Sequence, residues 1–284
     1  MGRVVTYLSF VRFSHSVFAL PFALAGALLA TRHASVTWPT VAWIVVAMVG
    51  ARSAAMGFNR LVDARTDALN PRTAKRELPR GAMSKVEAAM FVIVSSAVFV
   101  VASWMLSKLC LWLSPVALAI VFWYSLAKRY TSYTQMFLGL AVAVAPVGGW
   151  LAVGGRDGWE PWILALAIGT WVGGFDVLYA CQDLEFDRAH GLRSIPVRFG
   201  VPASLRISRV MHVVTVVALL ALPFVTPLPR IYDVGVIVVV APMLAYEQSL
   251  VRATDLSQVK RAFDLNGYVG ILYFLVLAVS VYVG

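Results

Sequence analysis

Long runs of apolar residues, separated by shorter polar segments, dominate the chain from beginning to end. A helix that crosses a bilayer needs roughly 20 consecutive, mostly apolar residues. Nine runs meet this length, and what remains leaves little room for a soluble domain. The expected spans cover residues 15–31, 39–61, 86–107, 109–127, 134–154, 161–183, 209–226, 232–250 and 264–283. The pattern predicts an all-α, polytopic membrane protein that forms one domain over residues 1–284.

Two details of this pattern concern the ends of the spans. Lys108 alone separates the third run from the fourth, so a tight hairpin is expected at Ser107–Lys108. The first run is long enough to remain in the membrane, and we expect it to be a span rather than a cleaved signal peptide.

The composition agrees with a membrane protein. Hydrophobic residues make up 60% of the 284 residues, charged residues make up 13%, and the mean hydropathy is +0.80. An average soluble domain is about 45–50% apolar and about 25% charged. Cys110 and Cys181 both lie within apolar runs and offer neither a disulfide framework nor a metal-ligand spacing. These values exclude an ordinary soluble enzyme, a disordered chain and a disulfide-stapled secreted module.

Lysine and arginine residues are distributed unevenly between the two sides of the expected membrane. One set of alternate segments, which includes the N-terminus, holds 19 of the 24 basic residues, and the other set holds 4. Cytoplasmic loops carry an excess of basic residues. We therefore expect the chain to lie in the cytoplasmic (inner) membrane with its N-terminus in the cytoplasm and its C-terminus outside. The net charge of +10 has the same explanation, so no nucleic acid is expected as a partner.

Two compact acidic groups lie at the expected cytoplasmic ends of the second and sixth spans. The first group consists of Asn59, Asp63 and Asp67, spaced four residues apart so that they line one face of a helix. The second group contains Asp183 and Asp187, which are again four residues apart. Like charges at this spacing destabilise a helix, so each group needs something that neutralises it.

Two kinds of partner could neutralise the acidic groups. Oxygen ligands without histidine or cysteine suit Mg²⁺, which takes one or two carboxylates and fills its other positions with water and phosphate oxygens. Alternatively, both groups are solvated helix ends whose acids pair with nearby arginines such as Arg65, Arg72 or Arg188. The presence of two matching groups on one side of the membrane favours the metal.

Basic residues follow each acidic group, and a metal with arginine and lysine beside it makes a clamp for a diphosphate. The candidate diphosphate ligands in these loops are Arg72, Lys75 and Arg193. Arg52 is a further candidate, because it lies within the second span, seven residues before Asn59 and on the same helix face. An intramembrane arginine needs an anionic ligand or a structural partner. Pairing of Arg52 with Asp176, seven residues before Asp183, is an equal alternative.

The remaining polar positions have both structural and functional interpretations. Lys128 and Arg129 end the fourth span, where a basic pair often serves only as a membrane anchor. Tyr179 lies between Asp176 and Asp183, where its ring or its phenol oxygen could stabilise a cation that forms during a reaction.

These residues together resemble the UbiA superfamily of intramembrane prenyltransferases over nearly the whole chain. The first family motif corresponds to Asn59, Asp63 and Asp67, with Arg60 in place of an acidic residue. The second corresponds to Tyr179-Ala180, Asp183, Asp187, Gly191 and Arg193-Ser194. A third segment corresponds to Tyr124, Lys128, Arg129, Tyr130 and Thr131. The loop over residues 70–74 resembles a bacterial branch described as 4-hydroxybenzoate polyprenyltransferase-like, part of which serves menaquinone formation by the futalosine route.

The resemblance implies a fold and a site. It implies nine helices around a central cavity, with both acidic motifs facing each other at the cytoplasmic mouth. Mg²⁺ would hold the diphosphate of a polyprenyl donor there, while the hydrophobic chain lies in a tunnel open to lipid. The implied metal ligands are Asn59, Asp63, Asp67, Asp183 and Asp187. The replacement at Arg60 leaves this set complete.

The implied reaction is transfer of a polyprenyl group to a ring carbon of an aromatic acid in respiratory quinone biosynthesis. Asp176 and Tyr179 are the candidates for stabilising the allylic cation or taking up the ring proton, and Arg129 (or Lys128) for binding the acceptor carboxylate. The acceptor is 4-hydroxybenzoate or, alternatively, a dihydroxynaphthoate of the futalosine route. A membrane transporter is a more distant alternative, because transporters place their charges at the midplane. The sequence leaves the prenyl chain length and the oligomeric state open.

Overall fold

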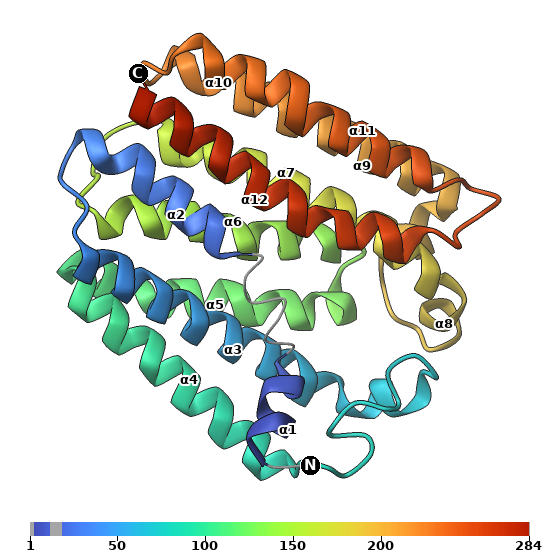
Figure 1. Ribbon diagram of the computed structural model, residues 1–284. Helices are drawn as coiled ribbons and strands as arrows, with labels where there is room; N and C mark the ends of the chain where they lie inside the picture. The colour runs from blue at the N-terminus through green and yellow to red at the C-terminus, as the bar shows by residue number, and fades with distance from the viewer. Residues whose placement is uncertain (1–2, 12–18, 284) are drawn as a thin grey trace.

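The structure, a computed structural model, describes residues 3–11 and 19–283, which form a bundle of helices (Figure 1). The helices are α1 (Arg3–Phe10), α2 (Leu20–Leu29), α3 (Trp38–Leu69), α4 (Lys85–Leu106), α5 (Lys108–Tyr130), α6 (Thr134–Ala152), α7 (Glu160–Ala180), α8 (Leu184–Ala189), α9 (Ile195–Ala221), α10 (Arg230–Gly235), α11 (Ala241–Leu250) and α12 (Val259–Val283). Short 3₁₀ turns are η2 (Ala30–Arg32), η3 (Cys181–Asp183) and η4 (Leu222–Phe224), and a π-helical segment is η5 (Val236–Val240). The expected all-α class is confirmed.

Each of the nine expected apolar helices has a counterpart in the bundle. Among the described residues, eight helices are long and apolar enough to cross a membrane, and a shorter apolar helix covers Leu20–Arg32. Residues 15–18 of the first expected span lie outside the described residues. The span Arg230–Leu250 is interrupted by η5, which ends two residues before Pro242. Proline removes a backbone donor and clashes with the preceding turn, which accounts for the irregular segment.

Ser107 alone connects α4 to α5, so the expected hairpin is confirmed. Its backbone N–H donates to the carbonyl of Ser103, and its hydroxyl accepts from the N–H of Cys110 at 3.0 Å. One residue thus closes the end of the first helix and caps the start of the second.

Two helices extend beyond the spans expected from hydropathy. Helix α3 continues to Leu69, past the predicted end at residue 61, and α9 begins at Ile195 instead of residue 209. The hydroxyl of Ser194 caps α9 and Pro196 occupies its first turn, where the missing N–H costs nothing. These extensions carry many polar residues, so a search for continuous apolar runs marks only the part of each helix within the membrane.

Small residues allow close packing of α2 against α6. A Cβ atom added to Gly149 on α6 would overlap the carbonyl oxygen of Ala23, and one added to Gly26 on α2 would overlap that of Pro146. Membrane helices lack a hydrophobic force between them and associate through such backbone approaches. This close approach fixes α2 against α6.

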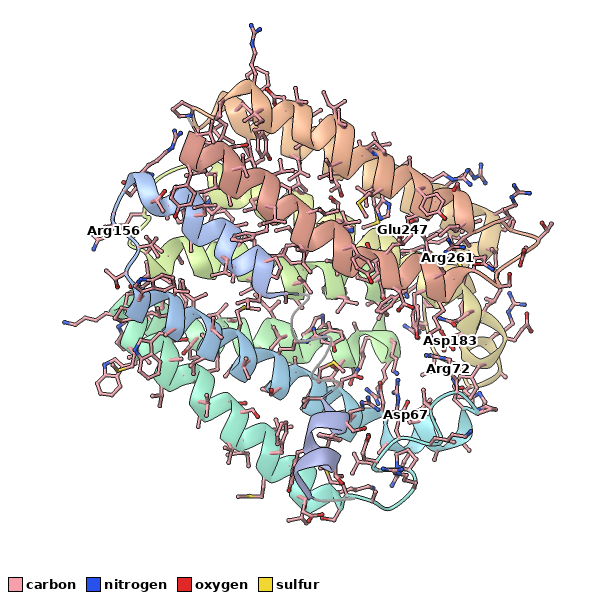
Figure 2. The ribbon with its side chains drawn as sticks, viewed as in Figure 1. Asp67, Arg72, Arg156, Asp183, Glu247 and Arg261 are labelled. Atoms are coloured by element: carbon pink, nitrogen blue, oxygen red, sulfur yellow. The ribbon has the colours of Figure 1, made fainter. Side chains whose placement is uncertain are left out.

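The fold brings two distant segments to the same end of the bundle. The loop that follows α3 and the short helix α8 both lie at one end in Figure 1. Figure 2 places Asp67, Arg72 and Asp183 at this end and Arg156 at the opposite end. The loop after α3 therefore meets η3, which follows α7, although 111 positions separate Arg72 from Asp183.

Candidate functional site

The acidic row on α3 lies on the buried side of the last three turns of the helix. Asp63 and Asp67 are 3% and 7% exposed. The side-chain amide of Asn59 donates to Oδ2 of Asp63 at 3.3 Å, so the first two members of the row are in contact. Buried carboxylates need cations or strong donors, and the structure provides a different set for each aspartate.

Asp63 is neutralised by the end of α5. The ammonium of Lys128 lies 2.5 Å from Oδ2 and the guanidinium of Arg129 lies 3.1 Å from Oδ1. Arg129 also donates to the carbonyls of Val62 and Ser125. Lys128 and Arg129 therefore connect the end of α5 to the acidic row on α3, in addition to any role as a membrane anchor.

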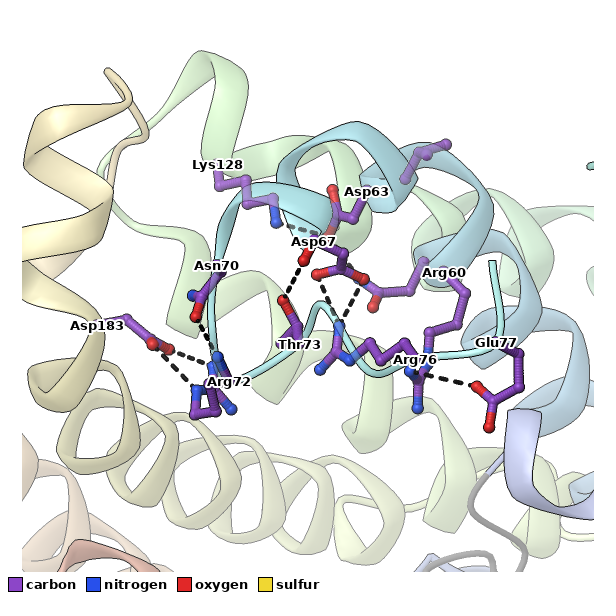
Figure 3. A network of polar contacts seen from close by, with 12 residues as sticks. Arg60, Asp63, Asp67, Asn70, Arg72, Thr73, Arg76, Glu77, Lys128 and Asp183 are labelled. Atoms are coloured by element: carbon purple, nitrogen blue, oxygen red, sulfur yellow. Dashed lines mark hydrogen bonds and ion pairs between the residues drawn. The ribbon is translucent and has the colours of Figure 1, made fainter. Parts of the chain in front are cut away.

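Asp67 is neutralised by the loop that follows its own helix. Nη1 of Arg76 donates to both carboxylate oxygens at 2.8 and 2.7 Å, and Thr73 donates its hydroxyl to the carbonyl of Asp67 (Figure 3). Asn70 ends the helix and accepts from the N–H of Arg72 at 2.9 Å. These bonds hold the loop after α3 against the acidic row. They also fix the position of Arg72 within that loop.

Arg72 connects the two acidic groups. Its Nε and Nη2 donate to the two oxygens of Asp183 at 3.2 and 2.6 Å (Figure 3). Its Nη1 donates to the hydroxyl of Tyr179 at 2.9 Å. The planar fork of arginine matches a carboxylate or a phosphate in this bidentate manner. A residue from the first loop thus contacts two residues of the second motif, which brings both motifs to one mouth.

The other acids of the second motif lie within electrostatic reach of this contact. Asp187 interacts with Asp183, Lys128 and Arg72, and Asp176 interacts with Asp183 and Asp187. Among the described residues neither Asp187 nor Asp176 forms an ion pair. The second group is therefore less neutralised by the protein than the first.

Arg60 forms a buried ion pair with the loop that follows α3. It is 4% exposed, and its Nη1 lies 3.8 Å from Oε2 of Glu77, whose other oxygen accepts from the hydroxyl of Ser9 at 2.6 Å (Figure 3). The side chain thus points toward the loop after α3 and toward α1. The basic residue in the first motif therefore joins the loop to the helix.

The candidate diphosphate ligands occupy three different environments. Arg193 is exposed at the mouth and donates to the carbonyl of Tyr130 at 2.6 Å. Lys75 is also exposed, and in the described part of the chain it has no hydrogen-bond or ion-pair partner. Arg52 lies deeper, where its Nε is buried without a hydrogen-bond partner, and the expected alternative of an ion pair with Asp176 is not formed between these described residues.

An apolar cavity of about 640 Å³ lies below the mouth, with walls from α2 to α7 and α9. Along α3 its wall contains a stripe of alanines, Ala47, Ala51 and Ala55, flanked by larger side chains; these are Ile44, Met48, Arg52 and Met56. Tyr124, which also lines it, precedes Lys128 by one turn of α5, so the cavity begins next to the charged site. Its volume lies in the range of about 300–1,000 Å³ that small-molecule sites occupy.

The chemistry of the donors at the mouth fits Mg²⁺. The two acidic groups that the contact of Arg72 with Asp183 links at this end of the bundle contain five oxygen donors and no histidine or cysteine; they are Asn59, Asp63, Asp67, Asp183 and Asp187. Over residues 3–11 and 19–283, no three acidic, histidine or cysteine side chains already converge on one point. Magnesium usually takes only one or two carboxylates and completes its shell with water and substrate phosphate. The residues therefore fit a metal that arrives with a diphosphate.

Sequence reasoning missed Arg76 and Glu77. Both lie in a loop whose many cations were attributed to membrane topology, and no periodic pattern distinguishes them there. Only the fold of the loop, fixed by Thr73 and Asn70, brings Arg76 back to Asp67.

The chain is similar to proteins of one family. The sequence profile of the UbiA prenyltransferase family matches residues 19–277. A 4-hydroxybenzoate octaprenyltransferase of Vibrio campbellii is 29% identical over 265 residues, which cover 86% of this chain and 90% of that protein. One of Citrobacter koseri is 32% identical over 247 residues, which cover 85% and 84%.

Solved structures have the same fold. The apo structure of a UbiA homolog from Aeropyrum pernix K1 superposes with a TM-score of 0.85 at 35% identity and covers 94% of this chain and 98% of that one. A UbiA homolog from Archaeoglobus fulgidus bound to DMAPP and Mg²⁺ superposes with a TM-score of 0.72 at 19% identity, covering 96% and 99%.

Proposed function

Because the chain belongs to the UbiA prenyltransferase family and is an enzyme that transfers prenyl groups, we propose that it transfers a polyprenyl group from polyprenyl diphosphate to a ring carbon of an aromatic acid. The relatives named 4-hydroxybenzoate octaprenyltransferase support a benzoate as the acceptor and a quinone pathway as the context. The single observation that carries the proposal is the contact of Arg72 with Asp183 and Tyr179, which joins both acidic motifs above an apolar cavity.

The donor diphosphate binds at this mouth. Asp63, Asp67, Asp183 and Asp187, together with Asn59, would hold Mg²⁺, which when bound would supply positive charge to the diphosphate oxygens. Arg72 and Arg193, assisted by Lys75, provide further positive charge where the leaving group develops its own negative charge. The prenyl chain extends into the cavity, whose apolar wall removes it from water.

The transfer breaks the bond between the allylic C1 and the diphosphate oxygen, and the diphosphate leaves with the electron pair. The ring of Tyr179 stabilises the allylic cation. A ring carbon of the acceptor then forms the new carbon–carbon bond, and Asp176 accepts the ring proton that is released. Exclusion of water from the cavity prevents hydrolysis of the cation.

Magnesium-dependent release of diphosphate tests the function. We expect the purified protein to release diphosphate and form a prenylated ring from geranyl diphosphate and 4-hydroxybenzoate, and to stop when the metal is chelated. The variants Asp63→Asn and Asp183→Asn should abolish turnover and remain folded. A second run with a dihydroxynaphthoate distinguishes the two candidate acceptors. A protein that forms no product with either acid contradicts the proposal.

The orientation of the chain belongs to the same proposal. The concentration of 19 basic residues in alternate segments supports a mouth and an N-terminus on the cytoplasmic side of the inner membrane and a C-terminus outside. A periplasmic reporter fused after Gly284 should be active, and the same reporter fused within residues 70–83 should be inactive. The opposite result contradicts the orientation.

A further inference from the structure

A chain of hydrogen bonds connects α7, α9 and α11 outside the acidic site. Nε2 of Gln248 donates to the hydroxyl of Ser208 at 2.7 Å, and this hydroxyl donates in turn to the carbonyl of Gly174 at 2.7 Å. The same amide nitrogen lies 3.0 Å from Nδ1 of His212. Ser208 and His212 are 0% and 4% exposed, and polar groups at such depth are normally hydrogen-bonded. The bonds therefore join three helices at one buried point.

The direction of each bond follows from the hydrogens that are available. Ser208 has one hydroxyl hydrogen and gives it to the carbonyl of Gly174, so its oxygen accepts from the neighbour on α11. The amide of Gln248 therefore presents its nitrogen, and the nearby Nδ1 of His212 accepts as well. The imidazole proton then lies on Nε2. Gln248 is thus the donor to both side chains of α9.

Gly174 lies on α7 at the level of Asp176, on the other side of the helix. The two residues are two positions apart, which corresponds to about 160° around a helix with 3.6 residues per turn. Asp176 follows Gly169 by seven positions, or almost two turns, so these two residues share a face. Gly169 lines the apolar cavity. The bond from Ser208 therefore supports α7 on the side opposite to Asp176.

Close packing limits the movement of α7 at the same level. A Cβ atom added to Gly174 would lie 2.6 Å from Cδ2 of His212, so α7 lies directly against α9 and has no room to approach it. The hydrogen bond from Ser208 opposes movement in the other direction. Together the two contacts fix the distance between α9 and the helix that carries Asp176.

We propose that Ser208 and Gln248 are positioning residues that hold α7 where Asp176 accepts the ring proton. The inference rests on the proposed function. In the proton step the ring C–H bond breaks, its electron pair restores the aromatic ring, and the proton passes to the carboxylate of Asp176. A misplacement of about 1 Å can lower the rate of such a step by about 100-fold. Donor binding depends less on this helix, because it is distributed over two acidic groups and Arg72.

The test removes the hydroxyl that supports α7 and compares the result with a matched serine. Ser208→Ala removes the bond to the carbonyl of Gly174. Ser204→Ala is the control, because Ser204 is equally buried, lies one turn earlier on α9 and donates at 2.8 Å to the carbonyl of Gly200 in its own helix. With geranyl diphosphate and 4-hydroxybenzoate, we expect kcat to fall by about 10–100-fold in Ser208→Ala. The control should react like the wild type.

An isotope effect distinguishes lost positioning from lost stability. The acceptor carries deuterium on both carbons beside the one that bears the hydroxyl group, and kcat is compared with that of the unlabelled acid. In the wild type the two acids should react equally fast, because a well-placed base removes the proton quickly. In Ser208→Ala proton removal limits the rate, so the labelled acid should react more slowly. A purely structural defect lowers the melting temperature without creating an isotope effect.

Gln248→Leu provides a second variant, which keeps the hydroxyl of Ser208. It removes the donor on α11, so we expect a smaller loss of kcat with an isotope effect of the same direction. Adding it to Ser208→Ala should lower kcat no further, because both changes act through one bond to Gly174. If Ser208→Ala does not fold, Gln248→Leu carries the test alone. The affinity for geranyl diphosphate with Mg²⁺, measured by tryptophan fluorescence, should keep its wild-type value in every variant.

Three results would overturn the inference. They are an unchanged kcat in Ser208→Ala and Gln248→Leu, an equal loss of kcat in Ser204→Ala, and a loss of kcat or of donor affinity without an isotope effect. In each of these cases the wild-type enzyme still prenylates an aromatic acid, so the proposed function stands. A wild-type protein without product from any aromatic acid contradicts the proposed function itself.

Discussion

Arg72 and Asp183 lie 111 positions apart in the sequence and form a two-point ion pair, at 3.2 Å for Nε–Oδ1 and 2.6 Å for Nη2–Oδ2. The arginine comes from the loop that closes the first acidic row, and the aspartate comes from the second. Because a diphosphate offers the same fork-shaped acceptor as a carboxylate, Arg72 has two alternative partners at the mouth. The pair therefore links the two acidic groups at the mouth, and in the proposed function the donor diphosphate replaces Asp183 as the partner of Arg72.

Replacement of this arginine should weaken donor binding. Arg72→Met removes the bidentate contact and should lower kcat/KM for geranyl diphosphate by about 10–100-fold. Arg72→Lys should recover only part of the loss, because an ammonium cannot form the fork. The measurement is steady-state kinetics at saturating aromatic acid, with thermal unfolding as the control for folding. A full recovery by lysine would show that charge alone matters at this position.

The sequence predicted the helices and the acidic rows because both depend on local spacing. The length of an apolar run determines whether it can form a helix that crosses the membrane. A spacing of four residues places Asp63 and Asp67 on the same face of their helix. The motif resemblance is confirmed by the family match, which also decides for an enzyme over a transporter. The partners of the acids could not be predicted, since the folded loop alone brings Arg76 to Asp67. The unpaired state of Arg52 likewise depends on how seven helices pack.

The pair of Arg60 and Glu77 should contribute to stability and not to donor binding. Both side chains are almost fully buried, and removal of one member of a buried pair costs about 3–5 kcal/mol because the other charge stays uncompensated. Arg60→Met should therefore lower the melting temperature and leave the KM for the donor unchanged. Adding Glu77→Gln to this variant should restore most of the lost stability, since the leftover charge is then gone. A changed donor KM would instead place Arg60 in the site.

Two adjacent glycines on α6 should respond differently to the same substitution. A Cβ at Gly149 would overlap the carbonyl oxygen of Ala23, whereas one at Gly148 would have no atom within 4 Å. Gly149→Ala should destabilise the protein by about 1–3 kcal/mol, the usual cost of overpacking. Gly148→Ala should be neutral or stabilising, since alanine is the better helix former. Thermal unfolding in one detergent compares the two, and equal melting temperatures would contradict the close contact of α2 and α6.

The alanine stripe on α3 should limit the length of prenyl chain that the cavity accepts. Ala47 lies further along α3 from the mouth than Ala51 and Ala55, so a donor reaches it only with the distal part of its chain. Ala47 lines the cavity, so Ala47→Phe places a ring in that part of it and reduces the volume left for the chain. We expect this variant to keep its activity with geranyl diphosphate and to lose most activity with octaprenyl diphosphate. The ratio of the two activities is the measurement.

Val49 provides the matched control for this substitution. It lies on the same helix, two residues away, but it is 38% exposed and does not line the cavity. Val49→Phe adds a ring on the outer side of α3, so both donors should react as in the wild type. A loss of long-chain activity in both variants would indicate a general disturbance of α3. Unchanged long-chain activity in Ala47→Phe would mean that the prenyl chain leaves the cavity before it reaches Ala47, through an opening between the helices toward lipid.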